Sequence, residues 1–316
     1  MMRSVKEALD DYAARYDAPN HQQKSIAWVK ERIPHLKRLL GKLSLLDLAE
    51  SRITGYMRTR STEGASNRTV NMELCVLARA IGRPFGQLWP NVPKLDERTD
   101  IGRALLPAEE GRLLAAASKN KSKYIYPFVR IALLTGMREG EIRTLQFARL
   151  DLNSKLLRVG RSKTPAGRGR GIPMNAELFS TIKGQADWIG ENFGEPEPDW
   201  YLFPFSNRVR PIDPKRPVTT MKTAWESVRT AAKVSCRFHD LRHTAATKMA
   251  ENDVPEATMK ALLGHMSKAM LERYSHIRNE AKRKATDSPT LATPIFEVPQ
   301  ESPQVTQKRK LKVVGK

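Results

Sequence analysis

The chain has 316 residues, and its 55 Lys and Arg against 34 Asp and Glu give a formal net charge of +21 at pH 7. This excess indicates a polyanionic partner without saying which one. A mean hydropathy of −0.52, with no apolar run long enough to span a bilayer, excludes a membrane-spanning protein. The charged N-terminal residues lack the apolar centre of a signal peptide, so we expect a cytoplasmic, nucleoid-associated protein.

Residues 1–94 have the pattern of a small helical domain. Apolar periodicity predicts helices over 5–16, 22–40, 46–60 and 67–81, separated by breaks near Pro19, Gly41 and Gly64. The region offers no reaction centre, but it is rich in basic side chains that could bind phosphates. They include Lys24, Lys30, Arg32, Lys37, Arg38, Lys42, Arg58, Arg60 and Arg68. We therefore expect a DNA-gripping domain.

Residues 95–106 are expected to form an interdomain linker. The periodicity lapses between 84 and 106, where prolines and a charged run replace it. A second domain should begin at Pro107, because proline is favoured in the first turn of a helix. Its first helices are predicted over 108–118, 123–135 and 138–145. The break at Thr135-Gly136 then places Arg138 at the start of the third helix.

The period changes from helix to strand between residues 147 and 174. Short strands are predicted over 149–152, 156–159 and 171–174, and turns between them favour three antiparallel strands. Helix returns after Asn175, a loop is expected over 194–217, and helices continue through Tyr274. The predicted fold is thus mainly α, with a small antiparallel β-sheet in the second domain. Residues 278–316 are expected to form a basic tail that is flexible or docked on a partner.

A histidine–arginine pair, another histidine and a tyrosine follow one another in the last helices. His239 and Arg242 are three residues apart, so on a helix they share a face and could reach one phosphate. His265 follows in Leu-Gly-His, and Tyr274 comes nine residues later. Histidine and arginine hold a phosphate and move its protons, and a nearby tyrosine can attack the phosphorus. The set predicts an enzyme that breaks and rejoins phosphodiesters.

Two further basic residues lie where strand or helix boundaries could present them to a phosphate. Arg138 begins a helix, where its guanidinium and free backbone amides can face one anion. Lys163 ends a strand before a flexible basic turn, from which it could donate a proton. Each residue alone has an ordinary structural alternative, such as an ion pair between Arg138 and Glu141 or a solvent-facing Lys163. Their joint order and spacing favour the functional interpretation.

A rival motif overlaps the same helix. The sequence from His239 to His243 also matches His-acid-x-x-His, which places two zinc ligands one helical turn apart. The acid is aspartate in place of the usual glutamate, no third ligand is identifiable, and Arg242 beside a dication would be unfavourable. The two cysteines, Cys75 and Cys236, lack the spacing of a disulfide framework or zinc site. We therefore expect neither a metal nor a cofactor.

These motifs resemble those of tyrosine recombinases of the phage integrase family. The resemblance extends from the first helix to His276, and every functional position of that family is filled. The matching residues are Arg138, Glu141 in the supporting acidic position, Lys163, His239, Arg242, His265 and Tyr274. The resemblance implies a helical, SAM-like core-binding domain over 1–94 and a catalytic domain over 107–277, which together close as a clamp on DNA.

The resemblance also implies a mechanism. Tyr274 would attack the scissile phosphate to form a 3′-phosphotyrosyl link, while Arg138 and Arg242 stabilise the developing charge. His265 would add a donor, His239 would help Tyr274 lose its proton, and Lys163 would protonate the leaving 5′-oxygen. A different 5′-hydroxyl can then reverse the attack, which gives strand exchange without a cofactor. Because two duplexes are each cut twice, the partners implied are a double-stranded recombination site and three further protomers in a tetramer on DNA.

Several related functions remain open from the sequence. The implied recombinase could serve a phage or other mobile element, with an accessory DNA-bending or directionality protein, and the length of the tail favours that role. The alternatives are a chromosome-dimer resolving recombinase, a type IB topoisomerase, and a DNA-binding protein that does not cut. The helical N-terminal region argues against the topoisomerase, and the complete residue set argues against a non-catalytic protein.

Overall fold

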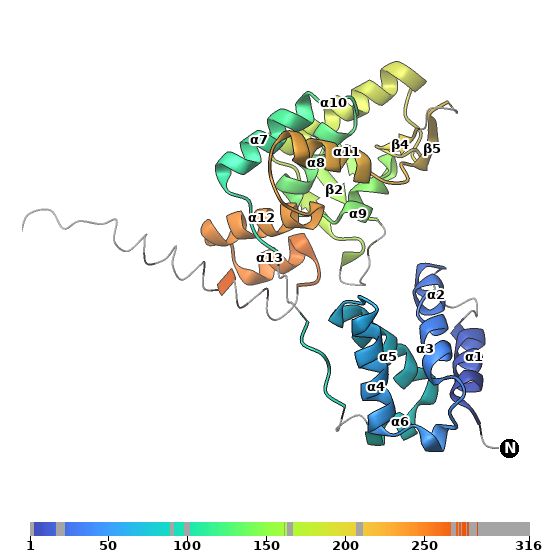
Figure 1. Ribbon diagram of the computed structural model, residues 1–316. Coiled ribbons are helices and arrows are strands. Elements are labelled where there is room, and N and C mark those ends of the chain that lie inside the picture. Colours follow the sequence, from blue (N-terminus) through green and yellow to red (C-terminus); the bar gives the residue numbers. More distant parts are fainter. Residues whose placement is uncertain are drawn as a thin grey trace, which may run out of the picture. The chain divides into compact units, whose positions relative to one another are not determined.

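The protein divides into two compact units, Met1–Ile101 and Gly102–Lys316, in the computed structural model (Figure 1). The boundary between them falls inside the segment 95–106. The structure describes residues 3–16, 23–88, 92–97, 102–160, 162, 167–206, 211–266, 270, 272, 274, 275, 277 and 283.

The first unit is mainly helical in its described residues. Its helices are α1 (Val5–Tyr16), α2 (Gln23–Lys30), α3 (Ile33–Leu40), α4 (Glu50–Thr62), α5 (Asn67–Ile81) and α6 (Arg83–Leu88), with a 3₁₀ turn at Leu45–Asp47. Helix α5 packs against α1, α3 and α4 through one apolar face, which makes it the centre of the unit. The core side chains that are fully buried include Leu9, Leu36, Ile53, Leu74 and Leu77.

Two of the four helices predicted for this unit, 5–16 and 67–81, are confirmed at both ends. The single helix predicted over 22–40 is wrong, because the chain turns at Glu31 and Arg32 before α3 starts. Pro34 lies in the first turn of α3, where a missing backbone N–H costs least, and would break a continuous helix. Helix α6 lies in a segment predicted to be irregular; Gly82, with φ of 75°, ends α5 and lets a new helix begin.

Arg60 is not available to a phosphate, which corrects the sequence-based interpretation. It is 7% exposed, and its Nη2 and Nε donate to the Glu73 carboxylate over 2.8 and 3.0 Å. The Tyr56 hydroxyl donates to the same carboxylate over 2.7 Å. A buried charge needs such partners, so Arg60 holds α4 against α5 rather than binding DNA.

The second unit combines helices with two small sheets. Its elements are α7 (Pro107–Ser118), α8 (Ile125–Thr135), α9 (Glu139–Arg143), β1 (Leu150–Asp151), β2 (Leu156–Arg158), β3 (Gly171–Pro173), α10 (Ala176–Phe193), β4 (Pro204–Phe205), β5 (Asp213–Pro217), α11 (Lys222–Ala231), α12 (Phe238–Glu251) and α13 (Glu256–Leu263). The mainly helical fold with small antiparallel sheets agrees with the prediction.

Helix α8 is the centre of this unit, with α7, α10 and α12 packed around it (Figure 1). It is apolar on nearly all sides, as expected of a helix enclosed by others. Phe128 packs edge-on against Phe203 and tilted against Phe238, with ring centroids 5.0 and 5.3 Å apart. These contacts fix α8, whose C-terminal end leads into the candidate site.

The first sheet has the predicted three antiparallel strands in the order β1-β2-β3, with Leu157 opposite both Leu150 and Ile172. The second sheet, a β4–β5 pair, lies where a loop was predicted over 194–217. That prediction failed because β5 reads Asp-Pro-Lys-Arg-Pro, which has no apolar alternation. Prolines are tolerated there because the two-stranded sheet leaves β5 at an edge.

Within the described residues, no helix is long and apolar enough to cross a membrane. The described positions 270, 272 and 274 are helical, as predicted through Tyr274, and the described positions 275 and 277 are helical as well. The tail predicted over 278–316 lies outside the described residues except at Arg283.

Candidate active site

The segment after α8 places Arg138 by a tight glycine turn. Gly136 ends the helix in the left-handed region, with φ of 62°, and a Cβ at this position would collide with the Leu263 side chain of α13. Arg138 follows as the N-cap of α9, and its backbone N–H donates to the Glu141 carboxylate over 3.0 Å. The Arg138 side chain is therefore held at a defined helix start.

Glu141 is a buried anion that organises the basic groups around it. Burial would raise its pKa, but hydrogen bonds from the Arg170 guanidinium, the Ser162 hydroxyl and the Arg138 backbone outweigh burial and lower the pKa to about 2. Arg170 Nη2 and Ser162 Oγ both donate to it over 2.7 Å. The sequence resemblance found Glu141, but it missed Arg170 and Ser162, because neither belongs to a motif.

Two guanidinium groups converge on a single acceptor. Nη2 of Arg138 and Nη2 of Arg242 donate to the main-chain carbonyl oxygen of His265 over 3.3 and 3.2 Å. Arg242 is 2% exposed and also donates to the Gly136 carbonyl over 2.8 Å. Burial, followed by the charge of Arg138, lowers the pKa of Arg242 to about 10, so it stays charged at neutral pH. The His265 carbonyl oxygen is neutral, and an anionic oxygen in its place would accept stronger hydrogen bonds from the two guanidinium groups.

Arg138 and Arg242, predicted from separate motifs, thus meet in space. His239 lies in the first turn of α12, the helix that also carries Arg242. Its ring lies edge-on to that of His243, with centroids 5.2 Å apart. Partial desolvation, then electrostatic interactions with His243 and with the positive charges of Arg242 and Arg138, lower the pKa of His239 to about 4. The imidazole of His239 is therefore neutral near pH 7.

Tyr274 is buried beside an imidazole that the sequence did not assign to it. Its ring is 1% exposed and packs in an apolar cluster with α12 and α13 residues such as Ala246 and Leu263. The Tyr274 hydroxyl lies 3.2 Å from Nδ1 of His243. Sequence reasoning considered His243 only as a zinc ligand and gave the tyrosine to His239. The signal that could have found it is its position next to Arg242.

The remaining predicted residues are placed incompletely. Lys163 lies outside the described residues, although its neighbour Ser162 is tied to Glu141. The side chain of His265 is exposed, and its backbone carbonyl contacts the two arginines.

The zinc motif is not assembled as a metal site in the part of the chain that the structure describes. No group of three or more His, Cys, Asp or Glu is close enough there to hold a metal ion. Asp240, the acid of the motif, instead accepts hydrogen bonds from the backbone and guanidinium of Arg237 over 2.7 and 2.9 Å. The aspartate caps α12, and its carboxylate is committed to that end of the helix.

A helical domain that brings two arginines, two histidines and a tyrosine together has the residues of a phosphoryl-transfer enzyme. Residues 103–281 match the model of the phage integrase family. Because this match covers more than half of the chain, the protein belongs to the phage integrase family. It is accordingly a site-specific tyrosine recombinase.

The similarity to individual proteins extends over both units. A shufflon-specific DNA recombinase of Escherichia coli is 26% identical over 289 residues, which cover 87% of this chain and 69% of that protein. The Tn1549 transposon integrase in complex with transposon right end DNA superposes with a TM-score of 0.70 at 20% identity, covering 90% of this chain and 99% of that one. A lambda integrase tetramer bound to a Holliday junction gives a TM-score of 0.66 at 19% identity, covering 89% and 78%. At this identity the structural matches show the fold.

Proposed function

We propose that this recombinase cuts and rejoins DNA through a covalent 3′-phosphotyrosyl link at Tyr274, in the service of a phage or other mobile element. The observation that carries the proposal is the convergence of Arg138 and Arg242 on one acceptor oxygen. A phosphodiester carries two nonbridging oxygens with shared negative charge, which suits two forked, permanently charged donors. A bound phosphate would replace the His265 carbonyl as their acceptor.

The chemistry follows from the neighbours of that phosphate. The Tyr274 oxygen bonds to phosphorus and its proton passes to an imidazole, while the bond to the 5′-oxygen breaks and Lys163 protonates that oxygen. His243 is the imidazole adjacent to the hydroxyl, and His239, neutral and close to both arginines, is available at the phosphate. His265 supplies a further donor.

Tyr274 must become accessible before it can attack. With 1% of its surface exposed, its hydroxyl cannot reach a phosphate from solvent while the apolar cluster is closed. If a DNA phosphate bound Arg138 and Arg242, their hydrogen bonds to the His265 carbonyl would be released. His265 lies in the chain between α13 and Tyr274. We propose that this exchange of acceptors opens the cluster, so that cleavage competence depends on DNA binding.

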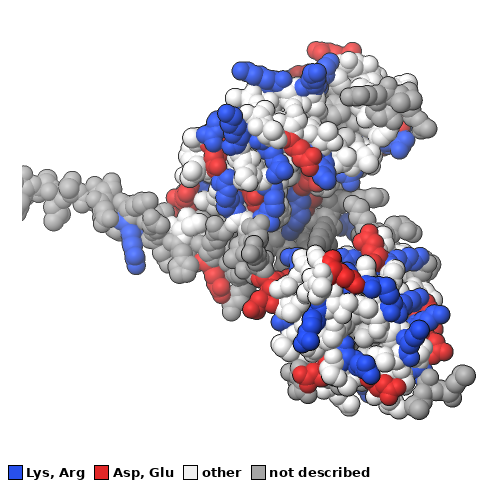
Figure 2. Space-filling view, viewed as in Figure 1, with Lys and Arg blue, Asp and Glu red and all other residues white. Residues whose placement is uncertain are grey.

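We further propose that residues 1–94 and 107–277, joined by the linker 95–106, close as a clamp on a double-stranded recombination site. The net charge of +21 supports this, and Lys and Arg side chains are spread over the visible face of both units (Figure 2). The DNA-bound state of the Tn1549 integrase and the tetrameric state of lambda integrase support DNA binding and assembly into a tetramer on DNA. Action in the cytoplasm at the nucleoid, and an accessory DNA-bending or directionality protein, are proposed on family grounds alone.

The test is covalent trapping. The full-length protein is incubated in EDTA with nicked suicide duplexes that carry DNA flanking its own gene, and denaturing gels are searched for a protein–DNA adduct. We expect an adduct with the wild type and none with Tyr274→Phe, while both bind the duplex equally. Tight, salt-sensitive binding without an adduct on any flanking site would contradict the proposal and favour a non-catalytic DNA-binding role.

A further inference from the structure

Three adjoining hollows surround the segment between α7 and α8, outside the candidate active site. Their volumes are about 530, 720 and 740 Å³, and Asn120 lines all three. The segment lies at the N-terminal end of α8, whereas Arg138 follows its C-terminal end. None of the residues that line the three hollows is one of the candidate active-site residues. We name the three hollows together the α7–α8 groove.

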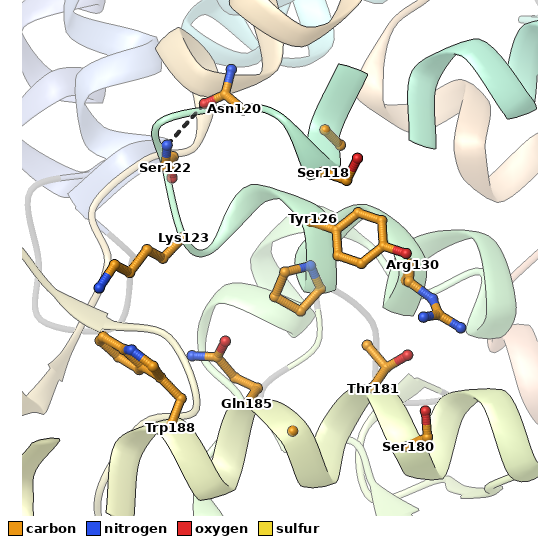
Figure 3. A pocket seen from close by; sticks show the side chains of 13 residues that line it. Ser118, Asn120, Ser122, Lys123, Tyr126, Arg130, Ser180, Thr181, Gln185 and Trp188 are labelled. Atoms are coloured by element: carbon orange, nitrogen blue, oxygen red, sulfur yellow. Dashed lines mark hydrogen bonds between the residues drawn. The ribbon is translucent and has the colours of Figure 1, made fainter. Parts of the chain in front are cut away.

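One wall of the first hollow is a single face of α10, and the other is formed by α8 and the segment before it. Figure 3 shows the α10 residues Ser180, Thr181, Gln185 and Trp188 facing Lys123, Tyr126 and Arg130 across the hollow. The ammonium of Lys123 lies 5.5 Å from the ring centroid of Trp188, and the guanidinium of Arg130 lies 5.6 Å from that of Tyr126. Aromatic surface and positive charge therefore line the same hollow.

Hydrogen bonds within the protein fix the conformation of the segment between α7 and α8 without a ligand. The Asn120 side chain accepts the Ser122 backbone N–H over 3.0 Å and donates to the Ser227 hydroxyl of α11 over 3.2 Å. These bonds tie the segment between α7 and α8 to α11, so a ligand would meet a formed surface.

The charge of the groove is one-sided. As far as the structure describes them, the linings of the three hollows contain no Asp or Glu. They contain six cations, which are Arg112, Lys119, Lys121, Lys123, Arg130 and Lys233. Of these cations, Arg130 forms an ion pair with Glu177. The Glu177 carboxylate lies 3.8 Å from the Arg130 guanidinium and is largely exposed. Such a surface favours an anionic occupant.

A buried hydroxyl in the groove also lacks a partner. Tyr124 is 7% exposed and lines the third hollow, and among the described residues its hydroxyl has no hydrogen-bond partner. Buried hydroxyls almost always have one. A carboxylate or peptide carbonyl of an occupant would supply the missing acceptor.

The sequence contains a segment of matching chemistry. Residues 285–307 include Asp287, Glu297 and Glu301 and no Lys or Arg, in a chain with 55 of these basic residues. The same segment carries an apolar centre at Ile295 and Phe296. A short acidic stretch with an aromatic anchor complements a basic groove lined by Tyr and Trp rings.

We propose that residues 285–307 of the same chain occupy the α7–α8 groove, with Phe296 between the aromatic walls and the carboxylates against the cations. The segment is long enough, since the roughly 13 residues from Arg283 to Phe296 can span about 45 Å. A folded unit of this size has a radius of gyration of about 16 Å. A tethered segment has an effective concentration on the order of millimolar, so occupancy by its own chain is favoured over occupancy by a second copy.

Photo-cross-linking in the full-length chain tests the proposal. The photoreactive residue p-benzoylphenylalanine replaces Phe296, and cross-linked peptides are mapped by mass spectrometry after irradiation without DNA. We expect cross-links to residues 117–130 and 180–188 in a band of monomer mass. The pair Lys123→Glu and Arg130→Glu should lower the yield at least about tenfold, because charge reversal repels the segment. The control Lys222→Glu reverses one charge, as each groove substitution does, but outside the groove linings, and should leave the yield unchanged.

A rescue separates charge complementarity from a folding defect. Glu297→Lys and Glu301→Lys, added to the groove double variant, should restore the cross-links, and thermal unfolding confirms that each variant is folded. Cross-links that map elsewhere, or a yield that the groove variants leave unchanged, would overturn the proposal. A cross-linked dimer would overturn occupancy by the same chain. Loss of duplex binding in the groove variants, with the cross-link yield unaffected, would assign the groove to DNA instead. The adduct assay with Tyr274→Phe is independent of all these outcomes.

Discussion

The Tyr274 hydroxyl lies 3.2 Å from Nδ1 of His243, on the helix that also carries Arg242. His243, which directly follows Arg242, thus contacts the proposed nucleophile Tyr274. His239, three residues before Arg242, does not need to reach the tyrosine. This relationship divides the work of the two histidines. We propose that His243 positions the tyrosine and takes its proton, whereas His239 acts at the phosphate.

Replacing His243 tests this division. We expect His243→Leu to slow covalent adduct formation by at least about 100-fold, the usual contribution of a positioned general base, with duplex affinity unchanged. His243→Asn keeps a hydrogen-bonding group and should recover the positioning part of the loss. The readouts are single-turnover adduct formation and its pH profile. Equal rates for both variants and the wild type would show that His243 has only a packing role.

Arg242 is predicted to be irreplaceable by lysine. Its guanidinium donates to two carbonyls at once, those of Gly136 and His265, and an ammonium cannot reproduce that fork. We expect Arg242→Lys and Arg242→Ala both to lower single-turnover cleavage by about 100-fold or more, the cost of removing one preorganised donor. Cleavage by Arg242→Lys within a few fold of wild type would contradict the assigned geometry. Gel-shift affinity, measured in parallel, separates binding from chemistry.

Glu141 is predicted to couple stability to acid pH. Its folded pKa of about 2 lies below that of an unfolded glutamate, so its contribution is fully present above about pH 4.5 and is lost as the pH falls toward 2. Glu141→Gln should flatten this part of the stability profile. At neutral pH the same change leaves the buried Arg170 without a counter-charge, and we expect it to cost about 3 kcal/mol or more.

Chemical unfolding of the wild type and Glu141→Gln between pH 2 and 7 measures both effects. Glu177→Gln is a suitable control, because that carboxylate is largely exposed and 3.8 Å from its partner. Parallel profiles for the wild type and Glu141→Gln would show that the Glu141 network does not govern acid stability.

The sequence correctly predicted helices whose ends are set by residues close by in the chain. Helix α5 starts at Asn67 because the Ser66 hydroxyl accepts the Thr69 N–H, and helix α7 starts at Pro107 for the same kind of local reason. The β4–β5 pair was missed because the prolines and charges of β5 carry no strand signal, and only its partner strand makes it a strand.

The burial of charged side chains could not be predicted in the same way. Arg60 is buried because Glu73 lies across the helix pair, and Arg170 because Glu141 lies 29 residues earlier in the chain. Both pairings depend on tertiary packing. Composition alone cannot distinguish a buried, paired arginine from an exposed one. The motif residues Arg138 and Arg242 were found because their spacing is characteristic, while the role of His243 required the position of Tyr274.

Gly136 is predicted to be the position where stability and activity are most directly linked. Alanine there must adopt a φ of 62° and would also meet the buried Leu263 side chain. The left-handed backbone costs about 1–2 kcal/mol, and displacement of Leu263 adds to it. Because the same turn positions Arg138 and supplies a carbonyl to Arg242, Gly136→Ala should also slow cleavage in folded protein.

A matched control isolates the packing part of this effect. Gly169 also has a positive φ, 76°, but a Cβ there would meet open space, so Gly169→Ala should show the backbone cost alone. We expect chemical unfolding to give a larger loss for Gly136→Ala than for Gly169→Ala, and Leu263→Ala to reduce the difference, because the smaller side chain removes the collision. Equal losses at the two glycines, with normal cleavage by Gly136→Ala, would mean that this turn does not set the position of the two arginines.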